Sequence, residues 1–316
     1  MSPTEAAEAE ITLRFLAAPT DAGQSGSVSA GRVLEWIDKA GYAAAAGWSG
    51  TYAVTAYVGN VRFTRPVEVG ELVEVTARVV HTGRTSMHIT VDVASGQPRT
   101  RELAPATRCL IIFVAVDEQG RSTPVRELVP ATLGAELEQR WAVRRADLRA
   151  EVEAAMRDQA YTDAGTAPRV VMRFLAAPSD VNWGGKVHGG IVMRWVDEAA
   201  HVLATRWTGS DRNVAIFTGG VRFYRPLRIG HVVEVEARLL HTGRTSMHVG
   251  VHVRSGDPAQ GPPGMELTTF CRTVFVAIDE HRRAVPCPTW EPVNEEDRAL
   301  DAHAVDLVRI RDRFGD

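Results

Sequence analysis

The chain carries one eight-residue sequence, HTGRTSMH, at residues 81–88 and again at residues 241–248. An identical octapeptide at two places indicates two copies of one domain, fused in tandem. The two copies align with few insertions, because the offset between equivalent residues grows only from 159 (residue 14 to residue 173) to 162 (residue 113 to residue 275). Features that both copies keep indicate fold or shared binding, and features that only one keeps indicate where the chemistry survives. Other strings that align the copies are RFLAAP (14–19, 173–178), RFTRP against RFYRP (62–66, 222–226) and FVAVDE against FVAIDE (113–118, 275–280).

The length and composition are those of a globular protein with two cores. The 316 residues are 45% hydrophobic and 24% charged, and each copy is close to the common domain size. A net charge of −3 argues against nucleic acid as a partner. The first ten residues are polar and acidic, without the apolar run of a signal peptide or membrane span. We therefore expect a cytoplasmic protein without a membrane partner.

The three cysteines do not suggest a disulfide or a metal centre. Cys109 and Cys271 occupy equivalent positions in the two copies, inside strand-like runs, and so belong to different domains. We interpret them, with Cys287, as reduced thiols. The ten histidines are scattered rather than grouped at the spacing of metal ligands, and the chain has no GxSxG sequence of a serine hydrolase.

Each copy has the same predicted order of elements. An apolar segment (residues 11–17, 170–176) leads into a glycine-rich loop and a helix-periodic stretch (28–48, 187–207). Four strand-like runs follow, at residues 53–65, 71–80, 86–94 and 105–116 in the first copy. This order predicts an α+β domain in which an antiparallel sheet wraps one helix. We expect domains at residues 1–128 and 169–316, joined by a linker (129–168) with a charged helix at 133–161, and a second charged helix at 295–314.

Each predicted long helix carries an aspartate beside its core face. Asp197 flanks the apolar stripe that runs from Val192 to Leu203, and Asp38 is its counterpart in the first copy. A carboxylate on a mostly apolar flank costs free energy, so its recurrence needs a reason. From the helix alone, a salt-bridged aspartate and a catalytic aspartate are equally good explanations.

The loops before these helices differ between the copies. Residues 180–190 read DVNWGGKVHGG, and residues 21–31 read DAGQSGSVSAG. Glycines at a helix N-terminus let a ligand approach the backbone, and the free N–H groups can stabilise an oxyanion; an ordinary tight loop is the alternative. In the first copy Asn182 is replaced by Gly23, His188 by Ser29 and Gly189 by Ala30, and only Gly190 is kept, as Gly31.

These motifs together resemble the acyl-CoA thioesterases of the hot-dog fold, specifically the tandem double-hot-dog acyl-CoA hydrolases. The resemblance rests on DVN…GGKVHGG, the helix sequence WVDE, VRFYRP, HTGRTSMH and FVAIDE, and it covers nearly all of both copies. It implies two hot-dog domains that pair back to back, and a homo-oligomer in which three such chains commonly assemble. It also implies hydrolysis of a fatty acyl-CoA or similar thioester to the free acid and CoA, without a metal or organic cofactor.

The resemblance also implies a site built across the two copies, with the loop of one facing the helix carboxylate of the other. The better site would join Asp38 to Asn182, Gly189 and Gly190, with the Gly190 N–H as oxyanion donor. The carboxylate would act as general base or as nucleophile. Asp197 would face the degenerate loop; if the sites are not crossed, it becomes the favoured catalytic residue. His188 is a weaker catalytic candidate, since a buried histidine bonded to backbone is as good an explanation.

We expect the CoA nucleotide near the two GRTS turns. These turns offer guanidinium, hydroxyl and backbone donors suited to phosphate, and the resemblance places CoA beside them. The arginines of the RFxRP strands are further candidates, although alternating arginines on a strand often form an ordinary solvated face. The candidates are Arg84, Thr85 and Ser86, with Arg244, Thr245 and Ser246, and the strand residues Arg62, Arg65, Arg222 and Arg225.

Two other functions fit the same sequence. A hot-dog dehydratase or hydratase would add or remove water on the acyl chain, using a histidine and a carboxylate; His188 is the residue that could support it. A non-catalytic acyl-CoA-binding module would account for the degenerate first loop. We expect a thioesterase, because one complete set of loop, helix terminus and carboxylate is retained.

Overall fold

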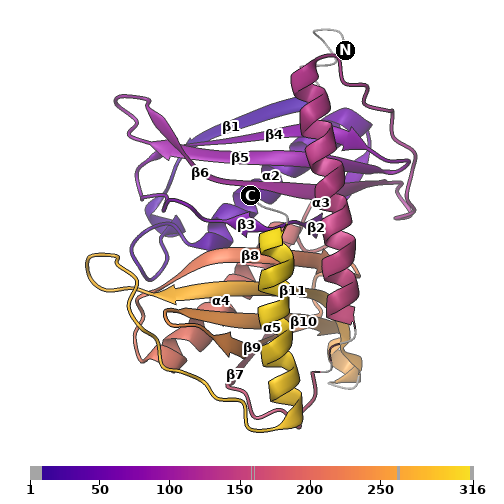
Figure 1. The fold of residues 1–316 in the computed structure, drawn as a ribbon. Helices are drawn as coiled ribbons and strands as arrows, with labels where there is room; N and C mark the ends of the chain where they lie inside the picture. The colour runs from indigo at the N-terminus through magenta and orange to yellow at the C-terminus, as the bar shows by residue number, and fades with distance from the viewer. Residues whose placement is uncertain (1–8, 158, 160, 262–263, 314–316) are drawn as a thin grey trace.

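Each copy folds into an antiparallel sheet wrapped around one long helix (Figure 1). The computed structural model describes residues 9–157, 159, 161–261 and 264–313. In the first copy the helix is α2 (Ala30–Ser49), and in the second it is α4 (Gly189–Thr208). The first sheet contains β1 (Glu10–Leu16), β2 (Tyr52–Val58), β3 (Val61–Arg62), β4 (Leu72–Thr82), β5 (Ser86–Gly96) and β6 (Leu103–Val116); the second contains β7 (Arg169–Leu175), β8 (Asn213–Phe223), β9 (Val232–Thr242), β10 (Ser246–Gly256) and β11 (Glu266–Ala277).

The two sheets join edge to edge into one eleven-stranded sheet. Its order is β1-β4-β5-β6-β2-β8-β11-β10-β9-β7, so the second half mirrors the first. At the junction, Tyr57 and Val58 of β2 pair with Arg222 and Val221 of β8, while β3 pairs with the earlier part of β8. The predicted α+β architecture of two tandem hot-dog domains is confirmed. The β2–β8 pairing is limited to these two residues of β2, so the rest of β2 is not paired with β8.

Helices α2 and α4 pack against each other on one face of this sheet. Ser29 caps the N-terminus of α2, where its hydroxyl accepts a hydrogen bond from the Arg32 N–H, and Gly50 ends that helix in the left-handed conformation. Leu34 and Ile37 of α2 and Met193 of α4 are fully buried against the strands. The predicted helices at 28–48 and 187–207 therefore exist, each displaced by one or two residues.

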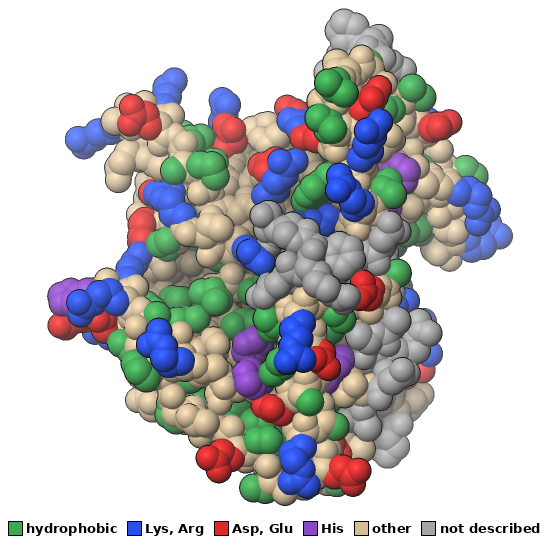
Figure 2. Space-filling model, in the orientation of Figure 1, with side chains coloured by type: hydrophobic (Ala, Val, Ile, Leu, Met, Phe, Trp, Pro, Cys, Tyr) green, Lys and Arg blue, Asp and Glu red, His purple; other side chains and the backbone are tan. Residues whose placement is uncertain are grey.

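Two charged helices lie on the opposite face of the sheet (Figure 1). Helix α3 (Leu133–Arg157) connects the copies, and α5 (Glu295–Arg313) follows the last strand. The first predicted helix (133–161) is too long, since α3 ends at Arg157 and residues 159 and 161 are not helical. Positions 158, 160 and 314 of the two predicted helices lie outside the described residues. Positive and negative side chains are interspersed over this face (Figure 2). Of the helices that the structure describes, none is long and apolar enough to span a bilayer.

One predicted strand is wrong in its extent. The run at residues 53–65 is divided into β2 and the two-residue β3, whereas its counterpart β8 is continuous. The break lies at Gly59, whose N–H donates to the Leu110 carbonyl at 2.8 Å. A side chain there would meet the same oxygen at 3.0 Å, so the backbone of β6 is too close for a regular strand residue.

Candidate active site

The Asp38 side chain lies at the contact between the two copies. Asp38 is near the middle of α2 and only 2% exposed. Its Oδ2 accepts a hydrogen bond from the Gly190 N–H, at the start of α4, at 2.7 Å. Its Oδ1 accepts one from the Thr55 hydroxyl of β2 at 2.6 Å. The positive end of the α4 dipole and these two donors stabilise an ionised carboxylate in a buried place.

The imidazole of His188 reaches Asp38 from the second copy. His188 occupies the N-cap position of α4, and its Nδ1 lies 3.0 Å from Asp38 Oδ2. The same Nδ1 accepts a hydrogen bond from the Gly190 N–H at 3.1 Å, so Asp38 and His188 share this donor. The His188 ring also lines the cavity described below.

The two glycines that start α4 have different roles. The Gly190 N–H is already bonded to Asp38, so the expected oxyanion donor is occupied in this structure. Within the part of the chain that the structure describes, the Gly189 N–H donates no hydrogen bond, and Gly189 lines the cavity. A Cβ on Gly189 would lie 3.0 Å from Asp38 Oδ2 and 3.2 Å from Thr55 Oγ1. Gly189 therefore leaves room beside the carboxylate, and its N–H is the available oxyanion donor.

The loop before α4 covers this site with an aromatic contact between the copies. Asn182 holds the loop together: its Oδ1 accepts from the Gly184 and Lys186 N–H groups, and its Nδ2 donates to the Val187 carbonyl at 3.3 Å. Asn182, which was expected to take part in the site, is thus engaged within the loop. Trp183 stacks on Tyr42 of α2, with ring centroids 4.5 Å apart and planes 4° from parallel.

A cavity of about 1270 Å³ opens next to Asp38. It lies where β2 and the end of β8 diverge beyond their paired residues, so both copies form its walls. Tyr52 lies in its wall, and burial, together with the charge of Asp38, raises the pKa of this phenol to about 12. The residues that line it include Asp38, Tyr42, Tyr52, Thr55, Asn182, Trp183, Lys186, His188, Gly189 and Arg225. We call this the Asp38 cavity.

The pseudo-symmetric site around Asp197 lacks some of the contacts that Asp38 has. Asp197 Oδ2 accepts from the Gly31 N–H at 2.9 Å, as Asp38 does from Gly190. Ala215 stands where the first copy has Thr55, so Asp197 Oδ1 is buried with no partner among the described residues. Ala30 stands where the second copy has Gly189, which puts a methyl group beside the carboxylate. Burial raises the pKa of Asp197 to about 6, although the Gly31 hydrogen bond lowers it in part.

The entrance that would serve Asp197 is closed by contacts between the copies. The Phe63 N–H donates to the Ile216 carbonyl at 3.1 Å, which continues the strand pairing beyond β3. Further out, Arg282 and Glu68 form an ion pair. Arg282 has a left-handed backbone, with φ of 60°, where the first copy has Gly120. The two crossed sites are therefore unequal, and the complete one contains Asp38.

The GRTS turns close hairpins at the end of the sheet. The Gly83 N–H bonds to the Ser86 carbonyl at 2.9 Å, and the Gly243 N–H to that of Ser246 at 2.8 Å. Arg84 and Arg244 are exposed. Neither these turns nor Thr85 and Thr245 line the Asp38 cavity or the two other cavities described below. Their expected contact with CoA stays a prediction.

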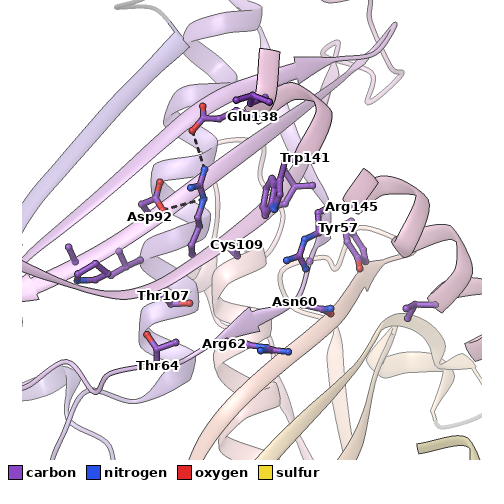
Figure 3. A pocket seen from close by; sticks show the side chains of 18 residues that line it. Tyr57, Asn60, Arg62, Thr64, Asp92, Thr107, Cys109, Glu138, Trp141 and Arg145 are labelled. Carbon is purple, nitrogen blue, oxygen red and sulfur yellow. Dashed lines mark hydrogen bonds and ion pairs between the residues drawn. The ribbon is translucent and has the colours of Figure 1, made fainter. Parts of the chain in front are cut away.

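The four arginines of the RFxRP strands have four different environments. Arg65 is bonded to Glu71 and to Ser95, in a largely buried network. Arg225 lines the Asp38 cavity and pairs with Glu266 at 2.5 Å. Arg222 lies over the Tyr224 ring, 5.0 Å from its centroid. Arg62 lines a separate cavity of about 830 Å³ between α3 and the outer face of the sheet (Figure 3).

Three side chains of the site were not among the sequence candidates. Thr55, Tyr42 and Tyr52 all belong to the first copy and surround Asp38. An alignment of the two copies contains a signal, since the second copy has Ala215, His201 and Arg212 at these positions. Trp36 and Trp195 pack in the core against Phe15 and Phe174.

The comparisons with known proteins agree with this architecture. The thioesterase superfamily pattern matches the chain twice, at residues 25–102 and 184–261. The chain is 24% identical over 330 residues to the acetyl-coenzyme A thioesterase of Rattus norvegicus, covering 98% of this chain and 58% of that protein's length. It is 23% identical over 302 residues to the cytosolic acyl coenzyme A thioester hydrolase of Homo sapiens, covering 89% and 77%.

One solved structure shares the fold over most of the chain. It is a protein from Lactobacillus plantarum described as an oleoyl thioesterase, with a TM-score of 0.60, 10% sequence identity, and coverage of 86% of this chain and 97% of that one. Three features agree on two copies of one domain: the sequence pattern occurs twice, each copy wraps a sheet around a helix, and an aspartate of each copy contacts the helix N-terminus of the other. The chain belongs to the thioesterase superfamily, as two hot-dog domains in tandem.

Proposed function

We propose that the chain is an acyl-CoA thioesterase, which hydrolyses acyl-CoA to the free acid and CoA. The observation that carries the proposal is the contact of Asp38 with Gly190 and His188 of the other copy, beside the free Gly189 N–H and a cavity of about 1270 Å³. A carboxylate and an unsatisfied helix N–H on one wall are the two groups that ester hydrolysis requires. The names of the rat and human relatives support the same reaction class.

In the proposed reaction Asp38 acts as general base. Two donors already occupy one lone pair on each of its oxygens, and the remaining lone pair on Oδ1 can accept a proton from water. The water oxygen bonds to the thioester carbon, and the carbonyl oxygen becomes an oxyanion bonded to the Gly189 N–H. When the C–S bond breaks, the electron pair leaves with sulfur, which takes up a proton. Direct attack by Asp38 is the competing route, and ¹⁸O from labelled water would then appear in the Asp38 carboxylate.

The remaining features of the proposal are a reaction without cofactor, an assembly and a compartment. Asp38 and the Gly189 N–H supply both the base and the oxyanion donor, so turnover should survive treatment with a chelator. We also propose a homo-oligomer, a trimer of chains, because the edge strands β1 and β7 expose Leu16 and Leu175, at 58% and 59%. Light scattering would measure its mass. We place the protein in the cytoplasm by analogy with the human relative.

The test is release of CoA from saturated acyl-CoA, measured with a thiol reagent across a series of chain lengths. Hydrolysis of at least one chain length by the wild type, with loss in Asp38→Asn, supports the proposal. Absence of CoA release from every member of the series contradicts it.

A hydratase or dehydratase is the second candidate, because His188 and Asp38 are in contact at 3.0 Å. Such an enzyme would release no CoA from a saturated chain but would add water to an unsaturated one. A non-catalytic binding module would bind acyl-CoA without turnover, and Asp38→Asn would leave its behaviour unchanged.

A further inference from the structure

A second polar cavity, of about 770 Å³, adjoins the Asp38 cavity. The two share Arg225 and Pro226, at the end of β8. Arg228 and His231 also line this second cavity, and Lys186 lies on the near wall of the Asp38 cavity. We call Lys186, Arg225, Arg228 and His231 the basic rim.

Two cations of the basic rim are held directly opposite each other. Lys186 and Arg228 are partners in an isolated antiparallel bridge, next to the hydrogen bond from the Val187 N–H to the Leu227 carbonyl. Like charges at opposed positions destabilise a strand pair. Within the described part of the chain, neither Lys186 nor Arg228 forms an ion pair with a carboxylate. An anion between them would remove this cost.

The equivalent positions in the first copy have the opposite character. The same backbone bond is present there, from the Val28 N–H to the Val67 carbonyl, so the two turns correspond. The lysine is replaced by a serine, and the second arginine and the histidine by glutamates, while only the first arginine is kept. In order, Lys186, Arg225, Arg228 and His231 correspond to Ser27, Arg65, Glu68 and Glu71.

The residues of the first copy are used for structure. Glu68 pairs with Arg282 of the second copy, and Glu71 is bonded to Arg65 and to Ser95. Of these contacts, the Glu68–Arg282 pair joins the two copies beside Asp197. The second copy has basic residues at the positions of these glutamates, at the entrance that leads to the complete site. Because the first copy forms the same turn without them, these basic residues are not needed for the fold of the turn.

We propose that the basic rim binds the phosphate groups of the CoA nucleotide while the thioester lies beside Asp38. This inference rests on the proposed function. A guanidinium and an ammonium on adjacent backbone segments can hold two oxygens of a phosphate, and each such charge-assisted bond is strong. The position differs from the GRTS turns, which line neither cavity.

The carboxylates nearby do not cancel the basic rim. Glu266 lines the second cavity but is paired with Arg225 at 2.5 Å. Asp257 also lines the second cavity and keeps its charge, with one oxygen accepting the Ala259 N–H at 2.9 Å. On the wall of the Asp38 cavity formed by the first copy, Asp117 is paired with Arg121, and Glu118 lies beside it. Among the described residues, Arg228 and Lys186 are the cations of the rim that no carboxylate pairs with.

The experiment exchanges the rim for the residues of the first copy. Steady-state kinetics would compare the wild type with Lys186→Ser, Arg228→Glu and the double variant, on an acyl-CoA and on the same acyl group carried by pantetheine, which has no phosphate. We expect the KM for acyl-CoA to rise at least about tenfold in Arg228→Glu, the loss of one charge-assisted hydrogen bond, with little change in kcat. The KM for acyl-pantetheine should stay unchanged, and Arg228→Lys should restore most of the affinity.

The matched control is Arg99→Glu, which makes the same charge change at an exposed hairpin of the first copy and should leave both substrates unaffected. An unchanged KM for acyl-CoA in the double variant, or an equal loss with acyl-pantetheine, would overturn the inference. Calorimetric binding of desulfo-CoA to the same variants separates the two proposals, because it needs no turnover. If the wild type hydrolyses no thioester but desulfo-CoA binding still weakens in Arg228→Glu, the proposed function fails and the phosphate site stands.

Discussion

The Asp38 Oδ2 atom lies 2.7 Å from the Gly190 amide nitrogen, although the two residues are 152 positions apart in the chain. The bond runs from the first turn of one copy's helix to the middle of the other copy's helix. The carboxylate therefore accepts one hydrogen bond from each copy, from the Gly190 N–H of the second and from the Thr55 hydroxyl of the first. Four predictions follow from this shared construction.

Replacing Asp38 should remove activity, whereas replacing Asp197 should not. Asp38→Asn keeps the shape of the side chain and eliminates the base, so kcat should fall by about 10²–10⁴-fold, the usual contribution of general-base catalysis. Asp197→Asn, the matched variant in the other copy, should retain kcat within about twofold. CoA release at saturating substrate measures both. Equal losses in the two variants would mean that both crossed sites are active.

Thr55 should act as a positioning residue for the carboxylate. Thr55→Ala installs the residue that the second copy has at this place and removes the 2.6 Å hydrogen bond to Asp38 Oδ1. We expect kcat to fall by about tenfold, since a hydrogen bond to a charged group contributes about 1.5–3 kcal/mol. Thr55→Ser keeps the hydroxyl and should recover most of the rate. If the serine variant is as slow as the alanine variant, the methyl group rather than the hydrogen bond is what matters.

A side chain at Gly190 should separate the two helices. A Cβ there would lie 2.7 Å from the Glu35 Cα of α2, which is backbone and cannot move aside alone. Gly190→Ala should therefore lower the free energy of unfolding by about 1–3 kcal/mol, as overpacking does. Gly134→Ala is the control: it is also the second residue of a helix, α3, but its Cβ would meet only Thr132 Oγ1, at 3.9 Å. Denaturant titration should find this variant neutral or slightly stabilised.

Asp197 should make stability depend on pH. Burial raises its pKa in the folded chain to about 6 from an ordinary value of 3.8. Below about pH 4 both states are protonated, and between about pH 4 and 6 the unfolded chain loses the proton while the folded one keeps it. Stability should fall as pH rises through this interval, by roughly 3 kcal/mol in all, and remain reduced above it.

The measurement for Asp197 is the free energy of unfolding from denaturant titrations at a series of pH values. Asp197→Asn cannot ionise and should lack this part of the slope. A variant with the same pH dependence as the wild type would assign the slope to other groups.

Much of the fold could be predicted from the sequence because it depends on local patterns that occur twice. The period of the residues around Leu34 and Leu203 predicts both long helices, and the shared strings fix their correspondence. Cys109 and Cys271, placed in equivalent strands, lie in β6 and β11, both buried. The edge-to-edge pairing of β2 with β8 has no such local signal, since it depends on the shapes of two complete sheets.

The site was less predictable because its geometry depends on close contacts between distant segments. The sequence around Thr55 shows only a strand residue, because its contact with Asp38 depends on how β2 packs beside α2. Trp183 stacks on Tyr42 of the other copy, and no sequence pattern within either copy predicts this contact. The sequence predicts the Gly190 N–H as the oxyanion donor, but in the structure this N–H is bonded to Asp38. The oxyanion donor that we propose is therefore the Gly189 N–H. Only coordinates determine which of two adjacent amides is occupied.

The continuous sheet across the junction of β2 and β8 makes the two duplicated halves dependent on each other. A self-paired first half would set Asp38 against Ser29 and Ala30, and a self-paired second half would set Asp197 beside Ala215. Neither homodimer would reproduce the arrangement of the fused chain. Each half therefore lacks a part that the other supplies, and we expect neither half alone to form the complete site.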